Sequence, residues 1–270
     1  MKSTLKLLKN KLNRITSFWC SDFSLATLKL YRIFEIQQLS MQVSFNKKKI
    51  LEVGSGFGWQ SKYLAKLGSD IKSVDIASSV EDGLQSSNYN LSKYKVFDDS
   101  KTQDKEKEND ESKIDYPVEK YDGVNLPYEN ETFDIVYSSN VLTHVENLDL
   151  LINDMKRVLK KDGIMIHGCT SSYWCFWTLI TGLIKRWYID PRSHSIISNN
   201  VFSEIINSRE KFWRKYFHNN GLKTINVINT KLFYTGNSIF DSKISVKKRN
   251  KLSKILGSST IFYILKEFKN

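Results

Sequence analysis

Three glycines within five residues stand where a nucleoside could bind. Gly54, Gly56 and Gly58 follow the apolar segment KKKILEV, and Asp75 ends the next apolar segment, 21 positions after Gly54. Glycines let a backbone turn tightly and let a ligand approach it closely. A carboxylate at this distance is placed to accept hydrogen bonds from ribose hydroxyls. The pattern therefore predicts a nucleoside-binding turn.

The spacing of the glycines narrows the choice of ligand. A dinucleotide site has the pattern G-x-G-x-x-G with the pyrophosphate at a helix N-terminus, whereas this chain has G-x-G-x-G. Glu52 lies two residues before the first glycine. A carboxylate there repels a diphosphate and suits a ligand with a sulfonium and an ammonium group. NAD is therefore disfavoured.

The segments that must position this turn alternate between strand and helix patterns. KKKILEV and DIKSVDIA are typical of short buried strands, and WQSKYLAKLG between them is typical of a helix that Gly68 ends. Further along, we expect a strand at 133–137, a helix at 148–159, a turn at 160–163 and a strand in IMIHG. Such alternation predicts an α/β fold built on a parallel sheet.

Taken together, these motifs resemble the class I S-adenosylmethionine-dependent methyltransferases, above all the small-molecule branch with ubiquinone- and menaquinone-biosynthesis-like enzymes. The resemblance rests on EVGSGFG, VDIA, DGVNLPYENETFD, VLTH and RVLKKDG, between about residues 49 and 168. The chain departs from the family at Lys161-Asp162, which replaces Pro-Gly, and at Tyr128, which replaces Phe. The resemblance implies a Rossmann-like, doubly wound sheet of seven strands, mostly parallel with one antiparallel strand.

The resemblance also implies S-adenosyl-L-methionine as the cofactor. Glu52 and the glycine backbone would hold its methionine end, Asp75 its ribose, and Asp122 its adenine amino group, while Ser139 and Asn140 would line the methyl-transfer site. The full set of implied cofactor residues is Glu52, Gly54, Ser55, Gly56, Gly58, Asp75, Ile76, Asp122, Gly123, Ser139 and Asn140. The three cysteines have no metal-ligand spacing, so no metal is expected.

The chain outside these motifs predicts further segments. We expect an N-terminal helical extension over 1–46, a methyltransferase domain over 47–240 and a basic helical tail over 241–270. Within the domain, the acidic segment at about 98–115 is expected to be a disordered insertion. A cap at about 171–215 is expected on the acceptor side, and two strands after Gly221 are expected to complete the sheet.

The cap segment and the loop after it suggest how an acceptor binds. SSYWCFWTLITGLIKRWYID is rich in aromatic residues, which suits an acceptor with an apolar part and an anionic part. Arg192 and His194 lie in a loop that should reach the cleft. His194 is the candidate general base for an acceptor hydroxyl, and a surface histidine with no role is the open alternative. We expect His167 and Asp134 to be structural. His144 is expected to be a packed histidine, and a catalytic role for it is the open alternative.

The positive net charge of the chain suggests an anionic partner. The net charge is +12 and the sequence pI is about 9.4, with most of the excess Lys and Arg in the two flanks. The amphipathic pattern from Leu5 to Trp19 fits either contact with a membrane surface or a helix over the cofactor cleft with its lysines in water. The basic tail fits either packing on the domain or contact with anionic lipid. The uncharged run Gly163–Ile184 is interpreted as a strand followed by a helix rather than a membrane span. The three cysteines form no disulfide framework, which predicts a cytoplasmic protein.

These observations favour methyl transfer to a small or lipid-linked acceptor, most of all at oxygen. A looser resemblance of residues 190–240 to methyltransferases found with bacterial surface-polysaccharide assembly enzymes points to glycan hydroxyls. A nucleic-acid methyltransferase is the first alternative, but N/D-P-P-Y/F, a Pro-Cys dipeptide and a recognisable RNA-binding module are all missing from the sequence. A non-catalytic cofactor-binding protein of the same fold is the second.

Overall fold

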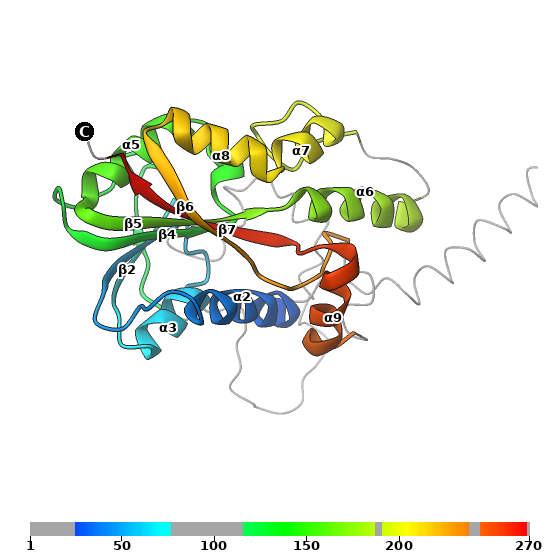
Figure 1. Ribbon diagram of the computed structural model, residues 1–270, viewed down its shortest axis with the longest axis horizontal. Coiled ribbons are helices and arrows are strands. Elements are labelled where there is room, and N and C mark those ends of the chain that lie inside the picture. Colours follow the sequence, from blue (N-terminus) through cyan, green and yellow to red (C-terminus); the bar gives the residue numbers. More distant parts are fainter. Residues whose placement is uncertain (1–24, 77–115, 187–190, 238–243, 269–270) are drawn as a thin grey trace, which may run out of the picture.

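The computed structural model describes residues 25–76, 116–186, 191–237 and 244–268, and a seven-stranded sheet runs through it (Figure 1). The strand order is β3-β2-β1-β4-β5-β7-β6. The strands are β1 (Lys49–Val53), β2 (Asp70–Asp75), β3 (Glu119–Lys120), β4 (Phe133–Ser139), β5 (Leu159–Thr170), β6 (Leu222–Asn229) and β7 (Thr260–Glu267).

The directions of the strands confirm the predicted fold class. β1 pairs in parallel with β2 and β4, and the pairs β2–β3 and β4–β5 are also parallel. β7 is antiparallel to both of its neighbours, β5 and β6. In a parallel sheet the carboxyl ends of the strands meet at one edge, and the order reverses between β1 and β4, so a crevice for a ligand is expected there.

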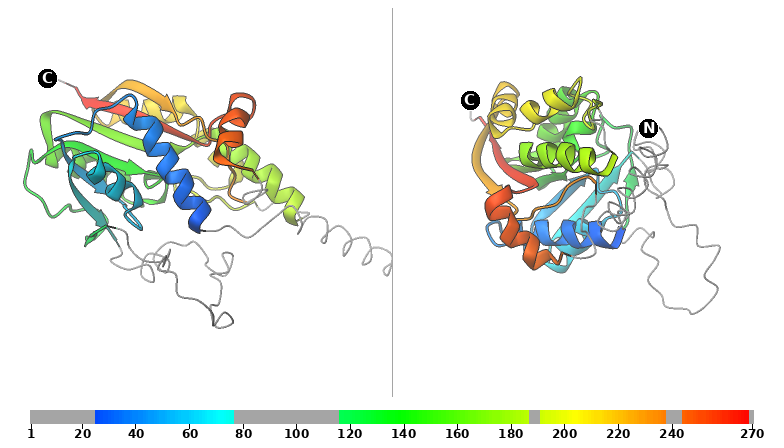
Figure 2. Two further views of the ribbon diagram at one scale, coloured as in Figure 1. Left: turned by 90° about the horizontal axis from the view of Figure 1, so that it is seen from below. Right: turned by 90° about the vertical axis from the view of Figure 1, so that its right-hand side faces the viewer.

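Helices cover both faces of the sheet, as Figures 1 and 2 show. α5 (Leu148–Val158) and α8 (Glu210–Asn219) lie on one face, and α2 (Leu25–Ser40) and α3 (Trp59–Lys66) lie on the other. The remaining helices are α6 (Ser172–Arg186), α7 (Val201–Asn207), α9 (Val246–Leu256) and the 3-10 helix η3 (Leu142–His144). The result is a doubly wound α/β sandwich with a hydrophobic core on each side of the sheet.

The sequence pattern explains most of these elements. The apolar stripe of α5 is buried at Leu148, Leu151, Ile152, Met155 and Val158, as the spacing predicts. The expected turn at 160–163 is wrong, because β5 already begins at Leu159 and includes those residues. Phe133 pairs with Leu159 and Ile135 with Ile164, so the extra residues are accommodated by a register shift beside β4.

The C-terminal part of the chain differs from the prediction. β6 matches the first strand expected after Gly221, but residues 230–237 form no strand. The antiparallel strand is instead β7, which lies between β5 and β6 and has six consecutive buried residues from Thr260 to Leu265. Within residues 244–268, the described part of the segment predicted as a basic helical tail, only α9 is helical, and the strand after it completes the sheet.

A buried polar cluster fixes α2 against the sheet. Arg32 donates to Glu35 at 2.6 Å and to the hydroxyl of Tyr234 at 3.0 Å, and that hydroxyl also contacts Thr260 of β7 at 2.9 Å. Gln60 of α3 donates to the Arg32 carbonyl at 3.0 Å. α2 is thereby held beside the helix that follows the glycine turn.

Some predictions lie outside the described residues. These are the amphipathic pattern from Leu5 to Trp19 and the acidic insertion at about 98–115. Cys20, one of the three cysteines, lies outside the described residues too. The run Gly163–Ile184 divides between β5 and α6, as predicted. Within the described ranges, the helices are too short or too polar to cross a membrane.

Candidate functional site

The glycine turn lies at the carboxyl end of β1, as predicted. The N–H groups of Gly54 and Ser55 donate to the Val74 carbonyl at 2.8 and 3.2 Å, so the turn is bonded to the neighbouring strand β2. All three glycines have positive φ, +73° at Gly54, +54° at Gly56 and +70° at Gly58. This left-handed backbone region is costly for other residues, which explains the choice of glycine.

Two of these glycines are also required for close packing, and one is not. A Cβ at Gly54 would overlap the side chain of Val141, which follows β4, and a Cβ at Gly58 would lie 2.8 Å from the Cβ of Tyr116. A Cβ at Gly56 would meet no atom within 4 Å. The turn is therefore fixed on two sides and open above Gly56, where a ligand could approach the backbone.

Asp75 and the residues after it form one wall beside the open glycine. The Gly56 N–H donates to Oδ2 of Asp75 at 2.7 Å, so the ribose-binding candidate lies directly at the turn. Tyr121 donates through its backbone to the Asp75 carbonyl at 3.0 Å. A Cβ at Gly123 would lie 3.4 Å from Ile76. The predicted adenine side of the site is thus brought next to the predicted ribose side.

Asp122 makes its bonds within its own loop. Its Oδ1 accepts from the backbone N–H of Val124 at 2.8 Å and of Asn125 at 2.6 Å, and its Oδ2 accepts from the Asn125 amide at 2.6 Å. Hydrogen bonds from the Asn125 side chain and from the two backbone groups lower the pKa of this exposed carboxyl. Asp122 therefore shapes the loop as a charged acceptor, and its contact with adenine stays a prediction.

Glu52 differs from the expectation of a charged carboxylate. Its side chain is buried, accepts a hydrogen bond from Ser61 of α3, and lies next to Ser73, whose hydroxyl is 2.6 Å from that of Ser61. Burial, opposed in part by the Ser61 bond, raises the pKa of Glu52 to about 8. The group therefore holds its proton at neutral pH unless a cation approaches it.

Ser139 and Asn140 end β4 opposite the turn. Asn140 has φ +58°, donates through its backbone to Gly168 at 2.7 Å and through its amide to Ser139 at 3.2 Å. Its Oδ1 is buried and has no hydrogen-bond partner among the described residues, and the same holds for Oγ of Ser55 in the glycine turn. Buried polar atoms are normally hydrogen-bonded, so these two unpaired oxygens near the open space at Gly56 suit a polar ligand that bonds to them.

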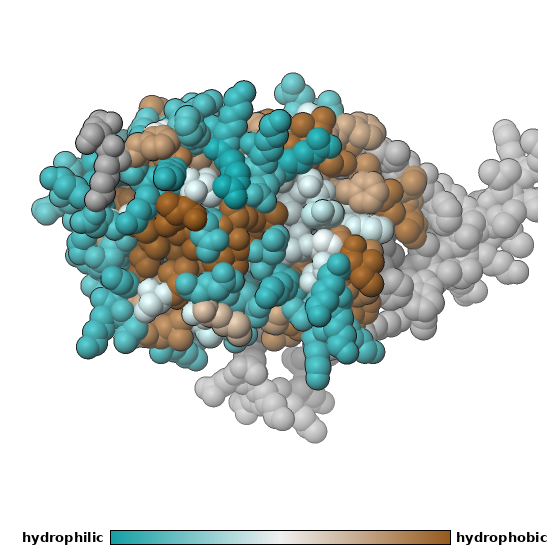
Figure 3. All heavy atoms as spheres, in the orientation of Figure 1, coloured by the Kyte–Doolittle hydropathy of each residue, from teal (hydrophilic) through white to brown (hydrophobic). Residues whose placement is uncertain are grey.

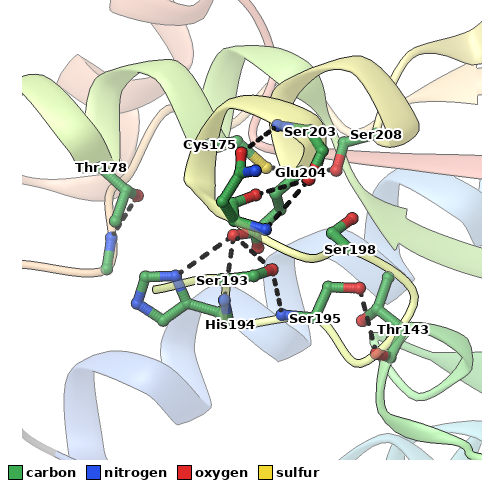
Figure 4. Close-up of polar contacts among 12 residues, drawn as sticks. Thr143, Cys175, Thr178, Ser193, His194, Ser195, Ser198, Ser203, Glu204 and Ser208 are labelled. Atoms are coloured by element: carbon green, nitrogen blue, oxygen red, sulfur yellow. Dashed lines mark hydrogen bonds and ion pairs between the residues drawn. The ribbon is translucent and has the colours of Figure 1, made fainter. Parts of the chain in front are cut away.

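The predicted general base lies in the loop before α7. His194 is partly exposed, at 41% of its side chain, and its ring lies edge-on to Trp174 of α6 with centroids 5.7 Å apart. The next two residues are bonded to η3: the Ser195 hydroxyl and the Ile196 N–H donate to the Thr143 carbonyl at 3.2 and 2.9 Å. Thr143 lies two residues after Val141, whose side chain borders Gly54, so the loop is bonded to the segment next to the glycine turn. Figure 4 shows Ser195 beside Thr143.

A buried carboxylate under this loop was missed by sequence reasoning. Glu204 of α7 is 3% exposed, and its Oε2 accepts from the Ser193 hydroxyl at 3.1 Å and the His194 N–H at 2.9 Å. The same oxygen lies 3.6 Å from Nδ1 of His194. Burial opposes ionisation, but the bonds from His194 and Ser193 outweigh it and lower the pKa of Glu204. No short-range pattern marks an acid whose partners lie ten residues away.

Of the residues predicted to be structural, His167 and Asp134 are held by hydrogen bonds, whereas His144 is exposed. His167 is fully buried, bonds to the Ser138 hydroxyl at 2.8 Å and has its pKa lowered to about 3 by burial, as expected for a core histidine. Asp134 accepts from Lys49 and Lys160 at 2.8 Å each. The prediction of a packed His144 is wrong, because it ends η3 with an exposed side chain. Among the described residues, His, Cys, Asp and Glu form no metal-binding group.

Comparisons with known proteins match this arrangement. Residues 51–167 match the family model described as a methyltransferase domain. Two ubiquinone biosynthesis O-methyltransferases are similar: that of Bartonella tribocorum is 27% identical over 133 residues, 49% of this chain and 45% of that protein, and that of Pelagibacter ubique is 24% identical over 117 residues, 43% and 40%. The matched part spans less than half the length of these relatives.

A solved structure supports the fold over more of the chain. A chain in the complex of the Haloferax volcanii Trm112 methyltransferase activator with a methyltransferase has a TM-score of 0.53 and 12% identity, covering 94% of this chain and 98% of that one. At this identity the likeness concerns the fold alone. The family match and the strand order together confirm the predicted resemblance and the cofactor that it implies.

Proposed function

Because residues 51–167 form a class I S-adenosylmethionine-dependent methyltransferase domain, we propose that this protein transfers a methyl group from S-adenosyl-L-methionine to a hydroxyl of a small-molecule acceptor. One observation carries the proposal. The open, left-handed Gly56 donates to Asp75 at 2.7 Å, with the unpaired oxygens of Ser55 and Asn140 at the same edge of the sheet. This arrangement supplies bonds for a nucleoside without a diphosphate.

The residues present fit this methyl donor. Asp75 would accept from its ribose hydroxyls, and Ile76, Gly123 and Asp122 would flank its adenine. Glu52 lies behind the turn, where a cation close to it would favour loss of its proton. The bound donor supplies an electrophilic methyl group, and the chain's own task is to align the acceptor and exclude water.

Calorimetric titration of the full chain with S-adenosylmethionine, S-adenosylhomocysteine and NAD tests the cofactor. We expect micromolar affinity for the first two, which corresponds to about 8 kcal/mol, and no binding of NAD. Binding of NAD alone, or of none of the three, would overturn the proposal and favour an oxidoreductase or a fold without this activity.

We further propose that the acceptor loses a proton to His194 as it is methylated, which agrees with the word O-methyltransferase in the names of the relatives. Transfer of labelled methyl groups to a panel of phenols and glycan alcohols tests this. His194→Asn should lower kcat by about 10²-fold or more and leave the affinity for S-adenosylmethionine unchanged. A variant with undiminished kcat would exclude His194 as the base.

A lipid-linked acceptor, with glycan hydroxyls as the reacting groups, is the finer part of this proposal. Along α6, Tyr173, Phe176, Leu183 and Ile184 are exposed, at 54%, 43%, 40% and 48%. α9, whose end accepts a bond from Trp177 at 3.0 Å, exposes four lysines, and Figure 3 shows hydrophobic side chains on this side next to hydrophilic ones over α9. Apolar and basic side chains together support contact with an anionic membrane surface.

A further inference from the structure

The strongest group of contacts that the cofactor site does not use surrounds Glu204. A carboxylate that is 97% removed from solvent costs several kcal/mol unless hydrogen bonds compensate for the lost water. Here three groups point at one oxygen, Oε2: the Ser193 hydroxyl, the His194 N–H and Nδ1 of His194, as Figure 4 shows. Two hydrogen bonds and a ring nitrogen at 3.6 Å therefore converge on one buried oxygen.

The helix that carries Glu204 is held in place independently of His194. Asn200 caps α7 and accepts from the N–H groups of Phe202 and Ser203 at 3.0 and 2.9 Å, and its own N–H donates to the Ser203 hydroxyl at 3.1 Å. Glu204 lies in the first turn after this capping box. Its position is therefore fixed by the cap rather than by the imidazole it contacts.

The backbone on both sides of His194 is also fixed. Ser193 bonds to Glu204 on one side, and Ser195 bonds to Thr143 on the other. The ring itself lies against the edge of Trp174. His144, at the end of η3, is close to both residues: desolvation lowers its pKa, Glu204 opposes this shift and His194 adds to it. The backbone that carries the imidazole is thus fixed between Glu204 and η3.

The charge of Glu204 decides which ring nitrogen carries a proton. A carboxylate accepts but cannot donate, so an Nδ1 that faces it is stabilised with its proton on. The neutral imidazole then has its lone pair on Nε2. This is the form that can take a proton from a hydroxyl.

We propose that Glu204 is a positioning residue that holds His194 as its Nδ1–H tautomer, so that Nε2 accepts the proton of the acceptor hydroxyl. This inference rests on the proposed function and deepens it. As the acceptor oxygen forms its bond to the methyl carbon, the bond from that carbon to sulfur breaks and the electron pair stays on sulfur. The hydroxyl proton moves to Nε2, Glu204 stabilises the resulting imidazolium, and the exposed ring returns the proton to solvent.

The tautomer can be measured without knowing the acceptor. We would label the histidines of the full chain with ¹⁵N, saturate it with S-adenosylhomocysteine, and assign His194 with a His194→Asn variant. We expect the Nδ1–H form in the native protein. Glu204→Gln, which keeps a side-chain oxygen, should retain this form, and Glu204→Met, which keeps the size of the side chain without an acceptor, should lose it.

A matched control separates this role from general effects. Glu210→Met on α8 removes an exposed carboxylate that pairs with Arg214 at 2.6 Å, and it should leave the His194 signals unchanged. An Nε2–H majority in the native protein, or a Glu204→Met spectrum like the native one, would overturn the proposal. If Glu204→Met does not fold, the native tautomer and the Glu204→Gln spectrum still decide.

The same samples distinguish failure of this inference from failure of the proposed function. Binding of S-adenosylhomocysteine by calorimetry tests the function, and the His194 tautomer tests the positioning role. Binding with the wrong tautomer overturns the positioning role alone. The expected tautomer without binding overturns the methyltransferase activity and leaves a Glu204–His194 pair that serves another reaction.

Discussion

The cofactor side and the acceptor side of this protein are built by different means. On the cofactor side, a turn of five residues presents backbone groups, and its partner Asp75 ends the next strand. On the acceptor side, His194 depends on Glu204 ten residues later and on a loop bonded to Thr143, 52 residues earlier than Ser195. A binding turn made of backbone groups requires glycines close together in the sequence. A cluster of side chains can instead form from residues that are far apart in the chain.

The largest loss of stability and of cofactor affinity is expected from Gly54→Ala, which changes the glycine turn itself. The new Cβ would combine a positive φ with overlap at Val141, which together cost about 3 kcal/mol, and affinity for S-adenosylmethionine should be lost. Gly56→Ala is the matched comparison, because it has the same kind of backbone but open space above it. Urea unfolding of both variants tests this, and equal losses of stability would contradict it.

Asp75→Ala should weaken binding of S-adenosylmethionine by about 2–3 kcal/mol, or about 10²-fold, because two charge-assisted hydrogen bonds to ribose are removed. Asp70→Ala, at the exposed start of the same strand, serves as the control. Calorimetry on both variants gives the comparison. Unchanged affinity in Asp75→Ala would remove this residue from the site.

A smaller effect is expected from Glu52, the buried acid behind the turn. Since its folded pKa of about 8 lies above its ordinary value of 4.5, the folded state keeps a proton that the unfolded state has released. The free energy of unfolding should therefore fall as pH rises between these two values. Glu52→Gln should flatten that dependence, measured by urea unfolding at several pH values; an equally steep dependence in the variant would place the cause elsewhere.

The smallest effect is expected on the acceptor side, at the surface of α9. Lys251→Gln should weaken binding to vesicles of phosphatidylserine and phosphatidylcholine by about 1 kcal/mol, because one exposed cation is lost. Lys215→Gln, on the exposed side of α8, is the control. Sedimentation with the vesicles measures both. Equal binding of all three proteins would show that α9 does not contact the membrane.

The two sides also differ in how well the sequence predicted them. The glycine turn, Asp75 and the strands that carry them follow from local patterns, because strand ends, turns and helices depend on neighbouring residues. The protonated state of Glu52 did not follow, since it arises from burial beneath Ser61 and Ser73. Glu204 was missed for the same reason, and His144 was expected to be packed because its exposure depends on distant loops.

The sequence by itself determined the α/β class, the resemblance to methyltransferases and the candidates for the cofactor side, since positive φ and strand periodicity are local properties of the chain. Only the tertiary structure decided which segment supplies the antiparallel strand. Residues 230–240 and Thr260–Glu267 are both apolar enough for that place, and the choice of β7 depends on its pairing with β5 and β6. It also decided that Glu204 meets His194, because that contact depends on how α7 packs against the loop.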